Sequence, residues 1–309
     1  NGHPDPRCRH ECGKRVNYVN MLKMRCPMKF MRSMLFGLLV VVVATAFVNA
    51  QKLKPEEVAA KNLESIGTPE ARAAAKTLIA VGTGTAKFLS NADLQSNGRI
   101  VIASEGTKFF LGINLESTSN RFADELYTFD GSNSSVGLPR QGNRSALGNF
   151  VQSNKMTLEQ GLLGGSLSTA WVIANIAENK GKLSFDGTKK IDGKEAYVLG
   201  YSKKGGGDVD VSLYFDKDTF RHVRTEYKRM SSAGIGLRPE DSTKYDETRF
   251  KIIEEFGDFR AESGLTLPHT YRIVYSTSGQ RGTTEIEWKF TLTEFAANQK
   301  LEASTFKAP

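Results

Sequence analysis

Cysteine is scarce in this chain of 309 residues, and its three copies lie close together at one end. Cys8, Cys12 and Cys26 all belong to the first 27 residues, so residues 51–309 contain no cysteine. A disulfide or a thiol nucleophile is therefore excluded for most of the chain.

Residues and motifs that carry catalysis are scarce as well. After residue 50 there are only two histidines, His222 and His269, and we expect both to be strand residues at the surface of a sheet. The chain has no G-x-S-x-G sequence, no H-E-x-x-H sequence and no Walker-type glycine loop. These absences favour a protein that is not an enzyme and that holds neither a cofactor nor a metal.

Only one long apolar run occurs, over residues 35–48, and its fourteen uncharged residues are fewer than the roughly 20 that a membrane-spanning helix needs. Lys29 and Arg32 precede it and Asn49 and Ala50 follow it, which is the order of a secretory signal peptide. We therefore predict an upstream, non-native or disordered segment over 1–27, a signal peptide over 28–50 cleaved after Ala50, and one domain over 51–309. A single uncleaved anchor is the alternative.

Excess positive charge is largely confined to the same leader. The whole chain has a net charge of +8, but residues 1–50 hold eight Lys or Arg and two acids, so residues 51–309 hold 34 bases and 32 acids. A net charge of +2 gives no support for nucleic-acid binding. No cysteine follows the apolar run to receive a lipid, so the sequence predicts a soluble periplasmic protein.

The pattern of the predicted domain changes from helical to extended near residue 77. Pro55 and Thr68–Pro69 are start signals for two short helices, the first ending at Gly67 and the second at about Lys76. Beyond them, stretches such as GDVDVSLYFD (207–216) and TEIEWKFTLTEF (284–295) alternate apolar and polar residues, with Tyr214 on a polar face. Turn pairs such as Asp192–Gly193 separate the strands, which indicates an antiparallel sheet.

One segment interrupts the extended pattern. Thr157 and Gln160 form a capping-box pair for a helix over 158–163, and Ser166 or Ser168 can begin a second helix that runs to about Asn179. The second helix is apolar on nearly all sides, so we expect a sheet to curve around it. The predicted fold class is mainly β with a few helices (α+β), an incomplete antiparallel β-barrel with a helical lid or plug.

The interior of such a barrel is the predicted site, because an apolar hollow could take an acyl chain at about 0.8 kcal/mol for each buried methylene. A packed core without a ligand is the alternative. We expect the lid to contribute Trp171, Val172, Ile173 and Ile176, and the wall to contribute Phe109, Leu111, Val209, Val211, Ile286 and Trp288.

Several phrases resemble the periplasmic outer-membrane lipoprotein-sorting family, the LolA-like proteins, in a divergent branch. They are ELYTFDGSNSSVG, KKIDGKEAYVLGYS, VSLYFDKDTFRHVRTEY, FGDFRAESGLTLPHTYRI and TLTEFAANQKLEASTFKAP. The resemblance implies helices that form a lid over a hydrophobic cavity, and a chaperone that shields the acyl chains of lipoproteins. We predict a carrier or chaperone that binds a lipoprotein acyl chain or another lipid, with envelope membrane proteins as further partners. A sensor or interaction scaffold on the same fold is the alternative function.

Overall fold

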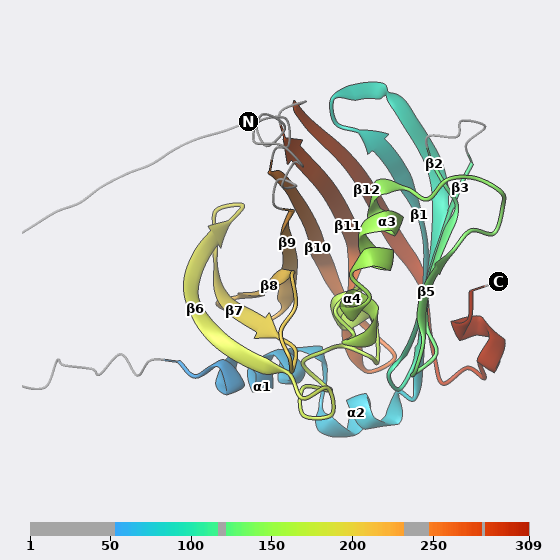
Figure 1. The fold of residues 1–309 in the computed structure, drawn as a ribbon. Coiled ribbons are helices and arrows are strands. Elements are labelled where there is room, and N and C mark those ends of the chain that lie inside the picture. Colours follow the sequence, from blue (N-terminus) through green and yellow to red (C-terminus); the bar gives the residue numbers. More distant parts are fainter. Residues whose placement is uncertain (1–52, 117–121, 232–246, 280–281, 309) are drawn as a thin grey trace, which may run out of the picture. The chain divides into compact units, whose positions relative to one another are not determined.

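One antiparallel sheet of twelve strands dominates this computed structural model (Figure 1). The structure describes residues 53–116, 122–231, 247–279 and 282–308, so the predicted signal peptide and the segment before it lie outside the described residues. The strand order is β5-β4-β3-β2-β1-β12-β11-β10-β9-β8-β7-β6, which leaves β5 and β6 as two unjoined edges. The predicted incomplete barrel is confirmed.

The strands are β1 (Thr77–Phe88), β2 (Asn91–Glu105), β3 (Lys108–Leu115), β4 (Glu125–Phe129), β5 (Ser134–Gly137), β6 (Lys182–Ile191), β7 (Lys194–Ser202), β8 (Asp210–Asp216), β9 (His222–Ser231), β10 (Thr248–Glu262), β11 (Leu265–Gly279) and β12 (Gly282–Ala297). The helices are α1 (Pro55–Ile66), α2 (Pro69–Ala74), α3 (Ala146–Ser153), α4 (Met156–Glu159) and the short 3₁₀ helices η1 (Gly165–Leu167) and η2 (Ala303–Phe306).

The predicted alternation places the apolar side chains of β12 on the inner face, where Ile286, Trp288, Phe290 and Leu292 are all buried. Tyr214 of β8 is an exception to the predicted polar face. It is buried on the opposite side of the sheet, in a small cluster with Ala196 and Val198, because those neighbours give the outer face its own apolar patch. The tight turn between β6 and β7 follows the prediction, since Asp192 and Gly193 both have positive φ, as a type I′ hairpin requires.

The two N-terminal helices form as predicted, although α2 ends at Ala74 rather than near Lys76. Each begins with a proline, and Thr68 Oγ1 accepts a hydrogen bond of 3.2 Å from the backbone N–H of Ala71. Both helices lie at one end of the sheet, next to the chain that leads into β6 (Figure 1). They therefore border the space that the sheet curves around.

We call residues 138–181, between β5 and β6, the internal segment. Figure 1 shows α3 and α4 of this segment on the concave side of the sheet, between β9–β12 and β1–β5. The predicted helix over 158–163 is reduced to the single turn of α4, and the predicted helix to Asn179 is wrong, since residues 172–180 form successive turns.

Backbone conformation ends the first predicted helix, and competing side chains disfavour the second. Gly161 has a positive φ, so a right-handed α-helix over 158–163 cannot continue through it. Asn175 Nδ2 then donates to the carbonyls of Thr169 and Trp171, and such bonds favour turns over a regular helix.

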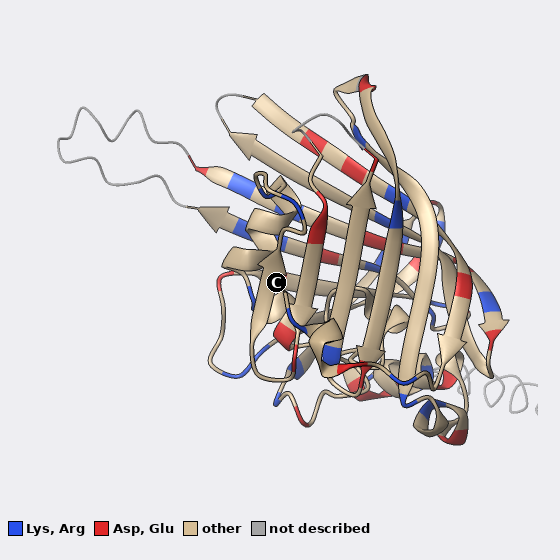
Figure 2. Ribbon diagram, turned by 90° about the vertical axis from the view of Figure 1, so that its right-hand side faces the viewer, with Lys and Arg blue, Asp and Glu red and all other residues tan. Residues whose placement is uncertain are grey.

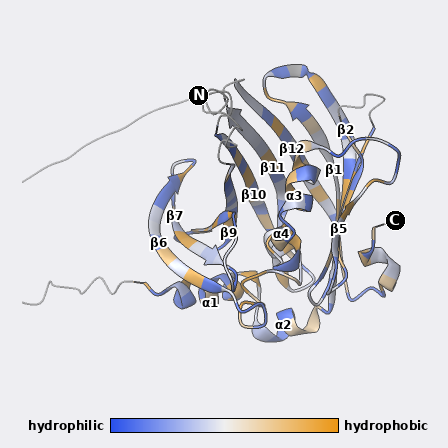
Figure 3. Cartoon of the chain, viewed as in Figure 1, coloured by the Kyte–Doolittle hydropathy of each residue, from blue (hydrophilic) through white to orange (hydrophobic). Residues whose placement is uncertain are grey.

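Charged side chains on the outer face of the sheet pair across neighbouring strands. Figure 2 shows where the charged residues lie along the strands. Glu255 of β10 accepts from Arg224 of β9 and from Arg272 of β11, both at 2.5 Å. Apolar and polar residues alternate along the strands (Figure 3), which separates this face from the dry interior. Among the described residues, none of the helices combines the length and apolar character needed to span a bilayer.

Candidate functional site

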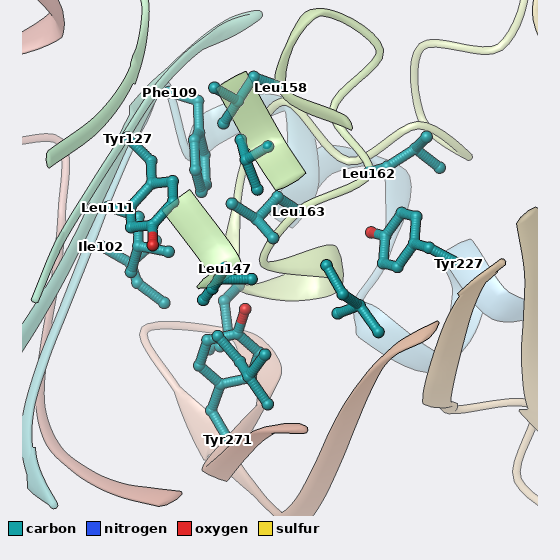
Figure 4. Close-up of a cluster of buried hydrophobic side chains, with 14 of the residues drawn as sticks. Ile102, Phe109, Leu111, Tyr127, Leu147, Leu158, Leu162, Leu163, Tyr227 and Tyr271 are labelled. Atoms are coloured by element: carbon teal, nitrogen blue, oxygen red, sulfur yellow. The ribbon is translucent and has the colours of Figure 1, made fainter. Parts of the chain in front are cut away.

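The centre of the concave face is a packed core. Leu158, Leu162 and Leu163 of the internal segment are at most 2% exposed and belong to the same core cluster as Phe109 and Leu111 of β3. Figure 4 shows these leucines among side chains that project inward from the strands. The internal segment thus fills the middle of the curved sheet like a plug.

All ten residues of the sequence-predicted site belong to this one core or pack against it. Ile176 is partly buried and the other nine are buried. The prediction that they share one interior surface therefore agrees with their positions, whereas their role in binding a ligand stays a prediction. The nine are Phe109, Leu111, Trp171, Val172, Ile173, Val209, Val211, Ile286 and Trp288.

Two cavities lie where the internal segment meets α1, away from the packed centre. The first, which we call the β6-side cavity, has a volume of about 550 Å³ and is bordered by α1, residues 173–183 and the start of β6. The second, the α2-side cavity, has a volume of about 500 Å³ and is bordered by α1, α2, residues 166–174 and the start of β11. Leu63 of α1 lines both, so the two cavities are neighbours.

Three of the predicted lid residues line these cavities. Ile173 and Ile176 line the β6-side cavity, and Trp171 lines the α2-side cavity. Val209 and Val211 line another cavity, of about 540 Å³, which is bordered by β6, β7 and the start of β8. Sequence reasoning missed Leu63, although its position with Ala59 and Ile66 on one face of α1 was a usable signal.

Trp171 joins the internal segment to α1. Its Nε1–H donates to Asn62 Oδ1 at 3.1 Å, and Asn62 Nδ2 in turn donates to the carbonyl of Phe220 at 3.0 Å. The indole also stacks on the His222 ring, with 4.3 Å between the ring centroids. Because Trp171 is 1% exposed and Asn62 is fully buried, this junction is a dry contact with a satisfied polar bond.

A buried carboxylate fastens the middle of the internal segment to the sheet. Glu254 of β10 is fully buried and accepts hydrogen bonds of 2.5 Å from the hydroxyls of Tyr227 and Tyr271, and one of 2.8 Å from the backbone N–H of Gly164. Burial raises the pKa of Glu254 from 4.5 to about 7, although these three donors lower it. Figure 4 shows both tyrosine hydroxyls directed into the interior.

A second buried carboxylate holds the start of α3. Glu125 of β4 accepts from the backbone N–H and the hydroxyl of Ser145, at 2.6 and 2.7 Å, and from the Tyr127 hydroxyl at 2.5 Å. Burial raises its pKa as well. The internal segment is thus tied to the sheet at both Ser145 and Gly164, while Trp171 ties it to α1.

Both histidines differ from their predicted surface positions. His269 is 5% exposed, and His222 is 1% exposed because it lies between Trp171 and Phe256, with ring centroids 4.3 and 4.6 Å away. Burial lowers the pKa of His222 from 6.5 to about 3, so the ring is neutral at pH 7. No local pattern distinguishes His222, because the residues that enclose it come from distant segments.

No family model matches the sequence, and no curated protein matches it. Solved structures do match. A DUF1329 family protein from Desulfovibrio piger is 12% identical, with 82% of this chain and 98% of that chain covered and a TM-score of 0.46. A LolA superfamily protein from Nitrosomonas europaea is 16% identical, with 82% and 98% covered and a TM-score of 0.43.

A third match is a putative outer membrane lipoprotein-sorting protein domain from Vibrio parahaemolyticus. It is 15% identical, with 80% of this chain and 97% of that chain covered and a TM-score of 0.39. Two of these three structures are named for the LolA-like or lipoprotein-sorting proteins that the sequence resembles, and all three are at most 16% identical to this chain.

Proposed function

We propose that this protein is a periplasmic carrier or chaperone that shields an acyl chain of a lipoprotein or another lipid. The observation that supports the proposal is the pair of cavities beside α1, which share Leu63 and are lined by apolar side chains of α1 and the internal segment. A carrier needs an apolar space that can open, because its ligand must enter and leave. The contact between α1 and the internal segment borders both cavities and is the part that we expect to open.

The size and lining of the β6-side cavity suit an alkyl chain. Its volume of about 550 Å³ falls within the roughly 300–1,000 Å³ of small-molecule sites. Its wall is made of alanine, leucine, isoleucine and glycine, and its two charged groups are Glu56 and Lys182. Each methylene buried there would contribute about 0.8 kcal/mol.

The hydrogen bonds that hold the internal segment to the sheet indicate which part of it can move when a ligand enters. Ser145 and Gly164 are held to the sheet by buried carboxyl groups, whereas residues 174–180 form turns and include the exposed Ala174 and Ala177. A chain entering beside α1 would displace these turns and leave the packed centre intact. The cost of opening is then confined to the contact between α1 and the internal segment.

Changing Ile176 to Glu should abolish binding of a fluorescent fatty acid to the purified protein. The charge would stand in the wall of the β6-side cavity and would have to be desolvated by an apolar guest. Because Ile176 is only partly buried, the variant should still fold. Fluorescence titration measures uptake, and circular dichroism checks the fold.

A matched control is Ile191→Glu, since Ile191 is also partly buried but packs on the outer apolar cluster. That variant should take up the fatty acid as the unchanged protein does. Equal uptake by a folded Ile176→Glu variant would rule out the β6-side cavity. A protein that takes up no lipid and is purified lipid-free from its own envelope would instead favour the interaction scaffold.

A further inference from the structure

The α2-side cavity differs from its neighbour in the charges at its border. Arg72 and Lys76 line it together with one acid, Glu105. Glu105 is already paired with Lys108, its Oε2 lying 2.7 Å from Nζ. The border of this cavity therefore has an excess of positive charge beside an apolar wall that includes Leu78, Leu265 and Leu267.

Arg72 is held in place by the end of α1. Its Nη1 donates to the carbonyls of Leu63 and Gly67, at 2.7 and 2.5 Å, which satisfies backbone acceptors that a helix end leaves free. No hydrogen bond from its Nε or Nη2, and no ion pair of Arg72 or Lys76, is found within the part of the chain that the structure describes. The guanidinium is thus fixed in orientation and retains donors for an anion.

A hydroxyl in the same cavity also lacks a partner. Ser166 lines the α2-side cavity, is 4% exposed, and its Oγ makes no hydrogen bond with the described residues. A buried polar group without a partner is unfavourable, and a polar atom of a ligand could supply the missing bond. Leu63, which borders both cavities, places this polar site next to the apolar β6-side cavity.

We propose that the α2-side cavity is a head-group site for an anionic amphiphile, with a carboxylate or phosphate at Arg72 and Lys76 and the alkyl chain along Leu63. This inference rests on the proposed lipid-carrier function and adds to it the charge of the ligand. The neutral form of the same chain should bind through the apolar wall alone and therefore more weakly.

Isothermal titration of the folded protein with dodecanoate and with 1-dodecanol tests the proposal. The unchanged protein should bind dodecanoate about tenfold more tightly, and added salt should reduce that preference. Lys76→Glu should weaken dodecanoate binding by about tenfold and leave dodecanol binding unchanged. Lys76 is exposed and its side chain makes no hydrogen bond that the structure describes, so this variant keeps the fold.

Lys300→Glu is the matched control, because the Lys300 side chain is 90% exposed and lies outside both cavities. It changes the net charge equally and should leave both affinities unchanged. Arg72→Gln, checked for folding by circular dichroism, should also reduce the preference for dodecanoate.

The outcomes separate the two proposals. Equal affinity for dodecanoate and dodecanol would overturn the head-group site and leave the carrier proposal standing. A preference for dodecanoate that survives both the Lys76→Glu and the Arg72→Gln change would overturn the location. If neither compound binds the unchanged protein, the carrier proposal fails together with this one.

Discussion

Replacing Trp171 with alanine should lower the free energy of unfolding by about 4 kcal/mol, which is the middle of the range for deleting a buried aromatic side chain. The change removes the stacking on His222 and leaves the buried Asn62 without the donor that its Oδ1 now accepts from. Urea unfolding followed by circular dichroism measures the loss. A decrease below about 1 kcal/mol would contradict the placement of Trp171 at the junction.

The same variant should weaken the docking of α1 more than the rest of the fold, because Trp171 contacts Asn62 of that helix. Trypsin cleavage after Lys61 of α1 should therefore become faster under native conditions. Trp288→Ala is the matched control, since Trp288 is buried in β12 and belongs to the same core. It should cost a similar free energy without selectively exposing Lys61.

Replacing Glu254 with glutamine should change how stability depends on pH. The folded protein retains a proton on Glu254 up to about pH 7, whereas the unfolded chain releases it near 4.5. This group therefore stabilises the fold below pH 4.5, and its contribution is lost as the pH rises through 7. The shift corresponds to about 3 kcal/mol over that window.

His222 changes the stability of the fold with pH in the opposite direction, over an overlapping pH range. Its pKa is about 3 in the folded protein and 6.5 by ordinary values, so the unfolded chain binds the proton first as the pH falls below 6.5. The fold thus loses stability on acidification through this group. Between pH 4.5 and 6.5 the two effects should largely cancel in the unchanged protein, because each has a slope of about 1.4 kcal/mol per pH unit.

Denaturant unfolding at several pH values between 4.5 and 8 tests this cancellation. Relative to the unchanged protein, Glu254→Gln should become more stable with rising pH, by about 3 kcal/mol between pH 4.5 and 7. His222→Phe should become less stable with rising pH over 4.5–6.5. If Glu254→Gln follows the same curve as the unchanged protein, Glu254 does not retain the proton.

The proton on Glu254 also bears on how the internal segment is held. Ionisation above about pH 7 would place a charge in the dry core. The hydroxyls of Tyr227 and Tyr271 would donate to it from the sheet, and the backbone N–H of Gly164 would be its one donor from the internal segment. Glu125 makes the corresponding contact at Ser145. Two buried carboxyl groups whose pKa values burial raises thus secure the internal segment of a protein proposed to open elsewhere.

Much of the fold could be predicted because it depends on local patterns. The alternation in 284–295 identifies the inner face of β12, since successive side chains of a strand point to opposite sides. The prolines at 55 and 69 identify α1 and α2 because their ring and missing N–H suit the first helical turn. These signals require no knowledge of distant residues.

The internal segment could be predicted only in part. Its apolar composition correctly indicated burial, and Trp171 and Ile173 are indeed buried. The helix to Asn179 was wrong because composition does not reveal that the side chain of Asn175 bonds to the carbonyls of Thr169 and Trp171. Short α3 was missed, although Ser145 accepts from Gly148 as an N-cap residue does.

By itself, the sequence determined an antiparallel sheet with one dry face, two leading helices and an apolar segment that had to be enclosed. Only the tertiary structure decided that the concave centre is filled and that two neighbouring cavities lie beside α1, at Leu63. The same holds for Glu254 and His222, whose pKa shifts arise from burial by residues far away in the chain. Periodicity is a property of neighbouring residues, whereas cavities and desolvation depend on how distant segments pack.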